Sequence, residues 1–195
     1  MSVVEFRRRA SVSQTGETLW LAHDDRLEQF GPEGQLVLTV PYSHVRRVRL
    51  AFAPGRIQQT RFLAELTGAR SQLTLTSMHF KGIGNFEDRF DTFEPLIRKV
   101  VAGVAAANPS AEFRAGERPA YYGLMLIFNI LAFGFLVLVV LALPISIGDV
   151  SITNLIKLGI VLISLPLMFS WAVNSRPRRF DPARDIDKVL AARRK

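Results

Sequence analysis

Two long stretches without charged side chains constrain this chain more than any other feature. No Asp, Glu, Lys or Arg occurs between Arg118 and Asp149, and none between Lys157 and Arg176. The apolar part of the first stretch has 20 residues, which as a helix spans about 30 Å, the thickness of a membrane's hydrocarbon layer. Uncharged segments of this length predict membrane helices, against the alternative of two buried helices in a soluble protein.

The two stretches predict a transmembrane hairpin over residues 121–175, with helices at about 124–143 and 153–173. A turn is expected where Pro144 follows the first helix. The flanking residues include aromatic side chains that prefer the headgroup region and arginines typical of the cytoplasmic side. The predicted interfacial anchors are Tyr121, Tyr122, Trp171, Arg176, Arg178 and Arg179.

The distribution of positive charge predicts the orientation. The chain carries a net charge of +8, of which +5 falls in residues 176–195 and +3 in residues 1–118. Lys157 is the only basic residue near the opposite ends of the two helices. Both termini are therefore expected in the cytoplasm, which makes the chain a multi-pass inner-membrane protein. The concentration of charge beside an apolar segment favours a membrane flank over nucleic acid as the reason for the high pI.

Three polar residues lie within the predicted hairpin. Lys157 is about one turn inside the second helix, from which it can extend to the headgroups. Asn129 and Ser164 lie at comparable depths in the first and second helices. We interpret Asn129 and Ser164 as contacts between the helices or with a membrane partner. An ion pathway at Lys157 is the alternative.

Residues 17–89 show short β-type segments separated by Gly, Pro and charged turns. Alternation of apolar residues predicts strands over 35–40, 45–52, 59–66 and 72–80. It places Leu36, Leu38 and Val40 on one inward face, and Val48 and Leu50 on another, with Arg47 and Arg49 outward. The turns expected at 53–56 and 68–71 connect these strands.

The period then changes from 2 to 3.6 residues, which predicts one amphipathic helix ending at Asn108-Pro109. Asp91 and Glu94 are spaced as a capping box at its start. The apolar stripe of this helix consists of Phe93, Leu96, Ile97, Val100, Val101 and Val104. A single amphipathic helix cannot bury its stripe alone, so we expect it to close one end of a bent sheet.

Residues 36–50, Leu-Val-Leu-Thr-Val-Pro-Tyr-Ser-His-Val-Arg-Arg-Val-Arg-Leu, carry a resemblance to a known family. This strand, Pro-Tyr step and second strand with spaced aliphatics resembles the bacterial pleckstrin-homology (PH)-like domains of small membrane proteins. The resemblance covers roughly residues 17–107. It implies an α+β fold in which an antiparallel PH-like β-barrel or sandwich is closed by one C-terminal helix, followed here by the two-helix transmembrane hairpin.

No residue pattern predicts catalysis, a cofactor or a metal site. The three histidines, His23, His44 and His79, lie in separate elements without ligand spacing, and the chain has no cysteine. What the sequence offers for binding is a run of arginines on two expected strands and the turn between them. This predicted face for a partner or for lipid consists of Arg46, Arg47, Arg49, Arg56 and Arg61. A solvated strand face interspersed with acids such as Glu65 is the alternative.

The predicted organisation is a basic N-terminal segment (1–16), a PH-like domain (17–107), a linker (108–120), the hairpin (121–175) and a basic cytoplasmic tail (176–195). In the tail, Ile186, Val189 and Leu190 are spaced as in an amphipathic helix on a membrane surface, with a disordered tail as the alternative.

The predicted function is a non-enzymatic, membrane-anchored adaptor, assembly factor or accessory subunit whose partners are membrane lipids and another membrane protein. The alternative is a sensor or carrier of anionic lipid.

Overall fold

A computed structural model describes residues 3–53, 57–68, 72–142, 157–159, 162–163, 166, 169, 173 and 176–191. The chain divides into two compact units. The first unit combines Met1–Ala115 with Arg178–Lys195, and the second is Gly116–Pro177. The first unit is α+β with mainly antiparallel sheets, as the sequence predicts, but its sheets do not close into a barrel.

The first sheet is a four-stranded antiparallel meander, in which each strand pairs with the next along the chain. It includes residues that the sequence assigned to a separate N-terminal segment, because β1 pairs with β2 over its whole length and buries Phe6. The strands are β1 (Val4–Arg8), β2 (Thr18–Ala22), β3 (Arg26–Phe30) and β4 (Leu36–Pro41).

The second sheet has five strands in the order β11-β10-β5-β6-β7. A 3-10 turn, η1 (Tyr42–His44), joins it to the first sheet. The pairing of β10 with β5 is parallel, and the other three pairings are antiparallel. The strands are β5 (Val45–Phe52), β6 (Phe62–Gly68), β7 (Gln72–Thr76), β10 (Glu112–Ala115) and β11 (Arg178–Arg179).

The predicted strand over residues 72–80 is two strands in the structure. Ser77 separates β7 from β8 (Met78–Gly82), which forms a hairpin with β9 (Asn85–Asp88). The break is stabilised by hydrogen bonds, because Ser77 N–H donates to the carbonyl of Phe62 at 3.1 Å and Phe62 N–H donates to Ser77 Oγ at 3.2 Å. β7 therefore ends at the point where the chain leaves the second sheet.

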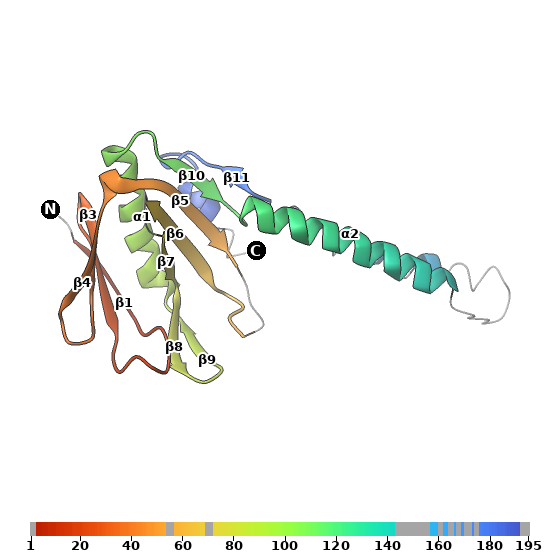
Figure 1. Ribbon diagram of the computed structural model, residues 1–195, viewed down its shortest axis with the longest axis horizontal. Coiled ribbons are helices and arrows are strands. Elements are labelled where there is room, and N and C mark those ends of the chain that lie inside the picture. Colours follow the sequence, from red (N-terminus) through yellow and green to blue (C-terminus); the bar gives the residue numbers. More distant parts are fainter. Residues whose placement is uncertain are drawn as a thin grey trace. The chain divides into compact units, whose positions relative to one another are not determined.

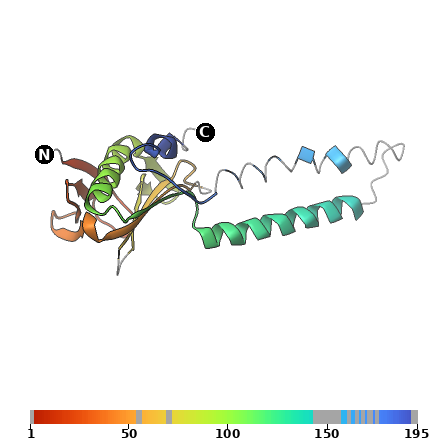
Figure 2. The same ribbon diagram turned by 90° about the horizontal axis from the view of Figure 1, so that it is seen from above.

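The helix α1 (Phe90–Ala107) confirms the predicted change of period. All six residues of its predicted stripe are buried, and α1 contacts β1, β2, β3 and η1 (Figure 1). Figure 2 shows the same helix lying beside the strands of the domain from a second direction. The predicted capping box is wrong, because Asp88 Oδ1 accepts from Phe90 N–H at 3.1 Å, while Glu94 pairs with Arg98.

A glycine inside α1 allows the helix to approach η1 closely. A Cβ atom on Gly103 would lie 2.3 Å from the ring of Tyr42, which is fully buried. Even alanine would therefore force the helix and the turn apart. Gly103 costs helix propensity but fixes the packing distance at the corner between the two sheets.

The C-terminal segment belongs to the folded domain. Figure 1 shows β11, in blue, beside β10, in green. Phe180 packs against Phe113 with ring centroids 5.9 Å apart, and the apolar side of α4 (Ile186–Leu190) buries Val189 and Leu190 in the main core. The helical spacing predicted in the tail is confirmed. Its apolar side packs on the domain, however, so the predicted membrane-surface helix and the separate tail are wrong.

The second unit contains α2 (Pro119–Ala142), a helix of 24 residues whose most apolar window of 18 residues has a mean hydropathy of 2.9. Only 6% of its most apolar window is buried within the protein, so its length and composition suit a membrane crossing. It is the one helix of this kind in the described part of the chain. Most of the second predicted membrane helix, including Ser164 and Trp171, lies outside the described residues.

The β10–β11 pairing predicts that the domain folds without the apolar second unit. Ala115 and Arg178 are opposite each other, so replacing Gly116–Pro177 by the turn Asn-Gly would connect the strands directly. We expect this shortened chain to be soluble and to unfold in one cooperative transition. A fragment ending at Ala115 lacks three buried side chains worth about 1.5–3 kcal/mol each, so it should be at least about 3 kcal/mol less stable. Equal stability in urea unfolding would contradict this account of the tail.

Candidate functional site

The five arginines of the predicted face have different surroundings. Arg46, Arg47 and Arg49 lie in β5, and Arg61 immediately precedes β6. Arg61 Nε donates to the carbonyl of Ala53 at 2.9 Å. Arg56 lies outside the described residues. These positions do not bring the arginines together as one solvated basic face.

Arg49 is a structural residue. Its guanidinium donates twice to the Glu65 carboxylate, both at 2.8 Å, and the two side chains are 9% and 8% exposed. The register of β5 and β6 sets the two residues opposite each other. Removing one partner of such a buried pair leaves an uncompensated charge and costs about 3–5 kcal/mol. Substitution of Arg49 would therefore report on folding before it reported on binding.

An irregularity at the start of β5 exposes two consecutive arginines. The register with β6 shifts between Val45 and Arg47, so Arg46 and Arg47 are both exposed instead of alternating across the sheet. They line a hollow of about 460 Å³ at the junction of η1, β5 and the segment after α1, which we call the polar hollow. Its walls are formed by Ser43, His44, Arg46, Arg47, Asn108, Ser110 and Glu112.

The side chain of Asn108, at the end of α1, fixes one wall of the polar hollow. Its Nδ2 donates to the carbonyl of Val45 at 2.9 Å, which ties the helix end to β5. Its Oδ1 accepts from the Ser110 N–H at 3.1 Å and from the Ser110 hydroxyl at 2.6 Å. The hollow is thus built on hydrogen-bonded backbone rather than on a loose loop.

Glu112 neutralises one of the two arginines in the polar hollow. Its carboxylate lies 3.0 Å from Arg47, 2.9 Å from Arg114 and 3.4 Å from Arg179. The hydrogen bond from Arg47 is the main reason that the pKa of Glu112 is lowered. Arg46 forms no ion pair within the part of the chain that the structure describes. Arg46, Arg47 and Glu112, the charged side chains that line the hollow, carry a net charge of +1, beside the hydroxyl groups of Ser43 and Ser110. Within the described residues Arg46 is the lining arginine without an ion pair, and its guanidinium suits a carboxylate.

A second hollow, which we call the apolar groove, adjoins the polar hollow because His44 lines both. It also has a volume of about 460 Å³ and lies between β4 and β7. Its walls are formed by Leu38, Thr39, Val40, Pro41, His44, Val45, Leu66, Gly68, Gln72 and Leu73. The predicted inward face of residues 36–40 is therefore wrong for Leu36 and Leu38, which are 56% and 37% exposed.

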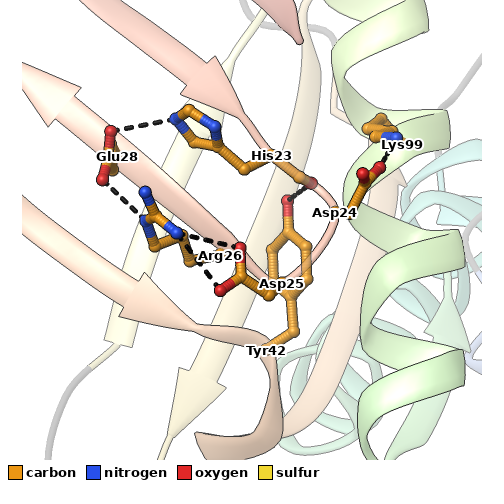
Figure 3. A network of polar contacts seen from close by, with 7 residues as sticks. All are labelled: His23, Asp24, Asp25, Arg26, Glu28, Tyr42 and Lys99. Atoms are coloured by element: carbon orange, nitrogen blue, oxygen red, sulfur yellow. Dashed lines mark hydrogen bonds and ion pairs between the residues drawn. The ribbon is translucent and has the colours of Figure 1, made fainter. Parts of the chain in front are cut away.

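The turn at His23, Asp24 and Asp25 is a structural brace, and Figure 3 shows its contacts. Lys99 of α1 holds Asp24, and the Tyr42 hydroxyl donates to the carbonyl of His23 at 3.3 Å. The hydrogen bond from Lys99 lowers the pKa of Asp24, and burial raises the pKa of Tyr42. The Asp24 side chain thus ties the turn to α1, the carbonyl of His23 ties it to η1, and the side chains of His23 and Asp25 contact Glu28 and Arg26 of β3.

Glu28 lies on β3, the strand that follows this turn, and forms a second set of ion pairs. Glu28 accepts from Arg26 at 2.7 Å and pairs with His23 at 2.9 Å. The hydrogen bond from Arg26 is the main reason that the pKa of Glu28 is lowered. No group of three or more His, Cys, Asp or Glu side chains suited to a metal ion occurs among the described residues.

The predicted polar and interfacial residues of the second unit are described in part. The Asn129 amide donates to the carbonyl of Met125 in its own helix at 2.8 Å, and Lys157 Nζ donates to the carbonyl of Leu141 at 3.2 Å. One donor of the Asn129 amide is thus engaged within α2, and the interpretation of Asn129 as a contact between helices or with a membrane partner stays a prediction. Tyr121 and Tyr122 lie in the first turn of α2, and Arg176, Arg178 and Arg179 are exposed.

Comparison with known protein families, curated proteins and solved structures gives no significant match. The likeness to PH-like domains therefore stays a prediction from residues 36–50. Sequence reasoning singled out Arg46 and Arg47 but missed Ser43, His44, Asn108, Ser110 and Glu112 as their neighbours. Asn108 was identified only as a helix stop, and no local pattern links it to β5, which is 63 residues away at Val45.

The surroundings of His79 predict a dependence of stability on pH. Arg9 N–H donates to His79 Nδ1 at 3.0 Å, which requires an unprotonated nitrogen, and burial followed by the charge of Arg89 lowers the pKa of His79. The unfolded chain therefore takes up this proton first, so the free energy of unfolding falls as pH drops below about 6.5. Carboxylates with lowered pKa values, such as Glu112, add their loss only below about 4.5.

We expect His79→Asn, which keeps an acceptor for Arg9, to reduce the loss of stability between pH 7 and pH 5. Urea unfolding of the full chain in detergent, followed by tryptophan fluorescence, measures it. His44→Asn, the same substitution at an exposed histidine, is the control that separates loss of the His79 contact from the general effect of replacing histidine by asparagine. Identical slopes for wild type and His79→Asn would show that His79 does not titrate below its unfolded value.

Proposed function

We propose that this chain is a membrane-anchored, non-enzymatic binding module that acts as an adaptor or accessory subunit of a larger inner-membrane complex. The observation that carries the proposal is that one folded domain contains chain from before and after the apolar segment. Such a domain is held directly at the membrane surface, where its effective concentration for a membrane partner is high.

The same observation supports the proposed topology. α2 is long and apolar enough to cross a membrane, and β10 and β11, on either side of the second unit, pair in one sheet. If α2 crosses the membrane, the chain between β10 and β11 has to cross an even number of times, because both strands belong to one sheet on one side. The proposed arrangement is two crossings, with both termini on the cytoplasmic side where Arg176, Arg178 and Arg179 lie.

The binding surface in this proposal is the polar hollow. Of the two arginines that line it, Arg47 pairs with Glu112, whereas the exposed Arg46 has no ionic partner among the described residues. The proposed role of Arg46 is to pair with an acidic side chain of the partner. No catalytic role is assigned to the domain.

A second function, contact with anionic lipid, is supported by the position of two arginines. Arg176 and Arg178 are exposed at the end of the apolar segment, where each basic residue near an anionic surface contributes about 1 kcal/mol of attraction. This contact would add to membrane attachment. It does not require the polar hollow, so substitutions there separate the two functions.

Extraction of the tagged chain in mild detergent tests the proposal. We expect the wild type to co-purify with one or more membrane proteins, and Arg46→Glu to lose them while it still inserts into the membrane. Reversal of an interfacial charge leaves two like charges facing each other, so at least a tenfold loss of co-purified partner is expected. Arg7→Glu is the control, since Arg7 is also exposed but lies on β1. Retention of the same partners by Arg46→Glu would contradict a role for the polar hollow.

A further inference from the structure

Two unpaired strand edges border the apolar groove. β4 is the last strand of the first sheet and β7 the last strand of the second, and no strand within the described ranges pairs with the outer edge of either. The groove has Leu38 and Val40 of β4 on one side and Leu73 of β7 on the other. It therefore occupies the gap that keeps the two sheets from closing into a barrel. Free edges of this kind can accept an added strand through main-chain hydrogen bonds.

The β4 edge is also unusually apolar. Leu36, Val37 and Leu38 are consecutive and 56%, 55% and 37% exposed, so both faces of this strand present aliphatic side chains to solvent. Proteins usually protect an edge strand with charged residues or proline, and only Pro41 at its end has that character here. An exposed aliphatic edge without such protection is typical of a surface that another chain covers.

Charge gives the expected ligand a direction. His44 connects the apolar groove to the polar hollow, where Arg46 presents its unneutralised charge. A ligand that follows β4 toward η1 passes from aliphatic side chains to a cation. Complementarity therefore requires an apolar segment that ends in an acidic residue.

We propose that an extended apolar segment of a partner protein adds as a strand to β4, fills the apolar groove and places an acidic side chain against Arg46. This inference rests on the proposed function and identifies the segment by which the partner binds. Main-chain hydrogen bonds to β4 supply affinity, and alternate side chains entering the groove supply specificity.

A lipid acyl chain fits these observations less well. It would fill the apolar groove but would offer no hydrogen-bonding groups to the edge of β4. The Glu112 carboxylate also lines the polar hollow, where it would repel a phosphate group, and Arg46 is the only lining arginine that forms no ion pair among the described residues. The observations favour a peptide with one carboxylate.

Selection from a phage-displayed library of random 12-residue peptides tests the proposal. The target is the full chain in nanodiscs of zwitterionic phosphatidylcholine. We expect the selected peptides to share alternating β-branched or aliphatic residues with an acidic residue near one fixed end. N-methylation at alternate residues should abolish binding for the set that faces β4 and leave it intact for the other set, because only one edge of an added strand donates to β4.

Two variants of the chain locate the site. Leu38→Lys should weaken peptide binding at least tenfold, whereas Ile83→Lys, the same kind of change at a 92% exposed residue of the β8–β9 turn, should leave it unchanged. Arg46→Glu should reverse the preference at the acidic position, so that a peptide with Lys there binds at least tenfold better than its acidic parent. Thermal unfolding of each variant separates loss of binding from loss of fold.

The proposal is overturned if no common sequence is selected, or if binding ignores both Leu38→Lys and N-methylation. Retention of phosphatidylglycerol by the wild type but not by Leu38→Lys, with no peptide selected, would assign the groove to lipid instead. These outcomes are distinct from failure of the proposed function. A chain that binds peptides in nanodiscs but co-purifies with no membrane protein retains the groove and loses the adaptor role.

Discussion

The pairing of β10 with β11 determines how the rest of the chain is organised. Four residues before the apolar segment and two after it form adjacent strands, with Arg114 opposite Arg179 and Ala115 opposite Arg178. β10 in turn pairs in parallel with β5, so the strands on either side of the apolar segment are attached, through β10, to the central strand of the second sheet. Phe113 and Phe180 extend this attachment into the core. The domain is therefore closed by residues that lie 63 positions or more apart in the sequence.

This closure has a consequence for the binding surface. Glu112 of β10 holds Arg47 and, more distantly, Arg179 of β11, so the same strands that attach the membrane segment also set the charge of the polar hollow. One arginine of the pair in β5 is neutralised and Arg46 is left exposed. β4 ends the first sheet and β7 ends the second, and among the described residues no strand pairs with the outer edge of either, where the apolar groove lies. The domain is thus joined to the apolar segment at β10 and β11, and its outer strand edges at β4 and β7 are open within the described residues.

Local sequence pattern predicted the elements that have strong periodicity. The stripe of α1, the buried Val48 and Leu50 of β5 and the helical spacing of α4 are all present in the structure, because apolar period and burial are directly coupled in each. The length and composition of α2 likewise follow from an uncharged run. These are the features that depend on neighbours within a few residues.

The remainder depends on contacts between distant residues. β11 has two residues and β10 has four, too few for a period to emerge, and their pairing joins segments on either side of the hydrophobic run. Arg49 was predicted to point to solvent because strand alternation says nothing about whether the outward side is covered. Its burial with Glu65 follows from the register of β5 and β6, and Glu112 reaches Arg47 across 65 residues. The sequence did not predict the polar hollow for the same reason, although Arg46 and Arg47, which line it, were both identified.

The central claim is that one domain is assembled from both sides of a membrane segment, which requires both sides to lie in the same compartment. Reporter fusions that are active only in the periplasm measure this most directly. The account predicts a silent reporter after Lys195, a silent reporter at the N-terminus and an active reporter inserted at Gly148. An active reporter after Lys195 with a silent one at the N-terminus would place β10 and β11 on opposite faces of the membrane and contradict the account.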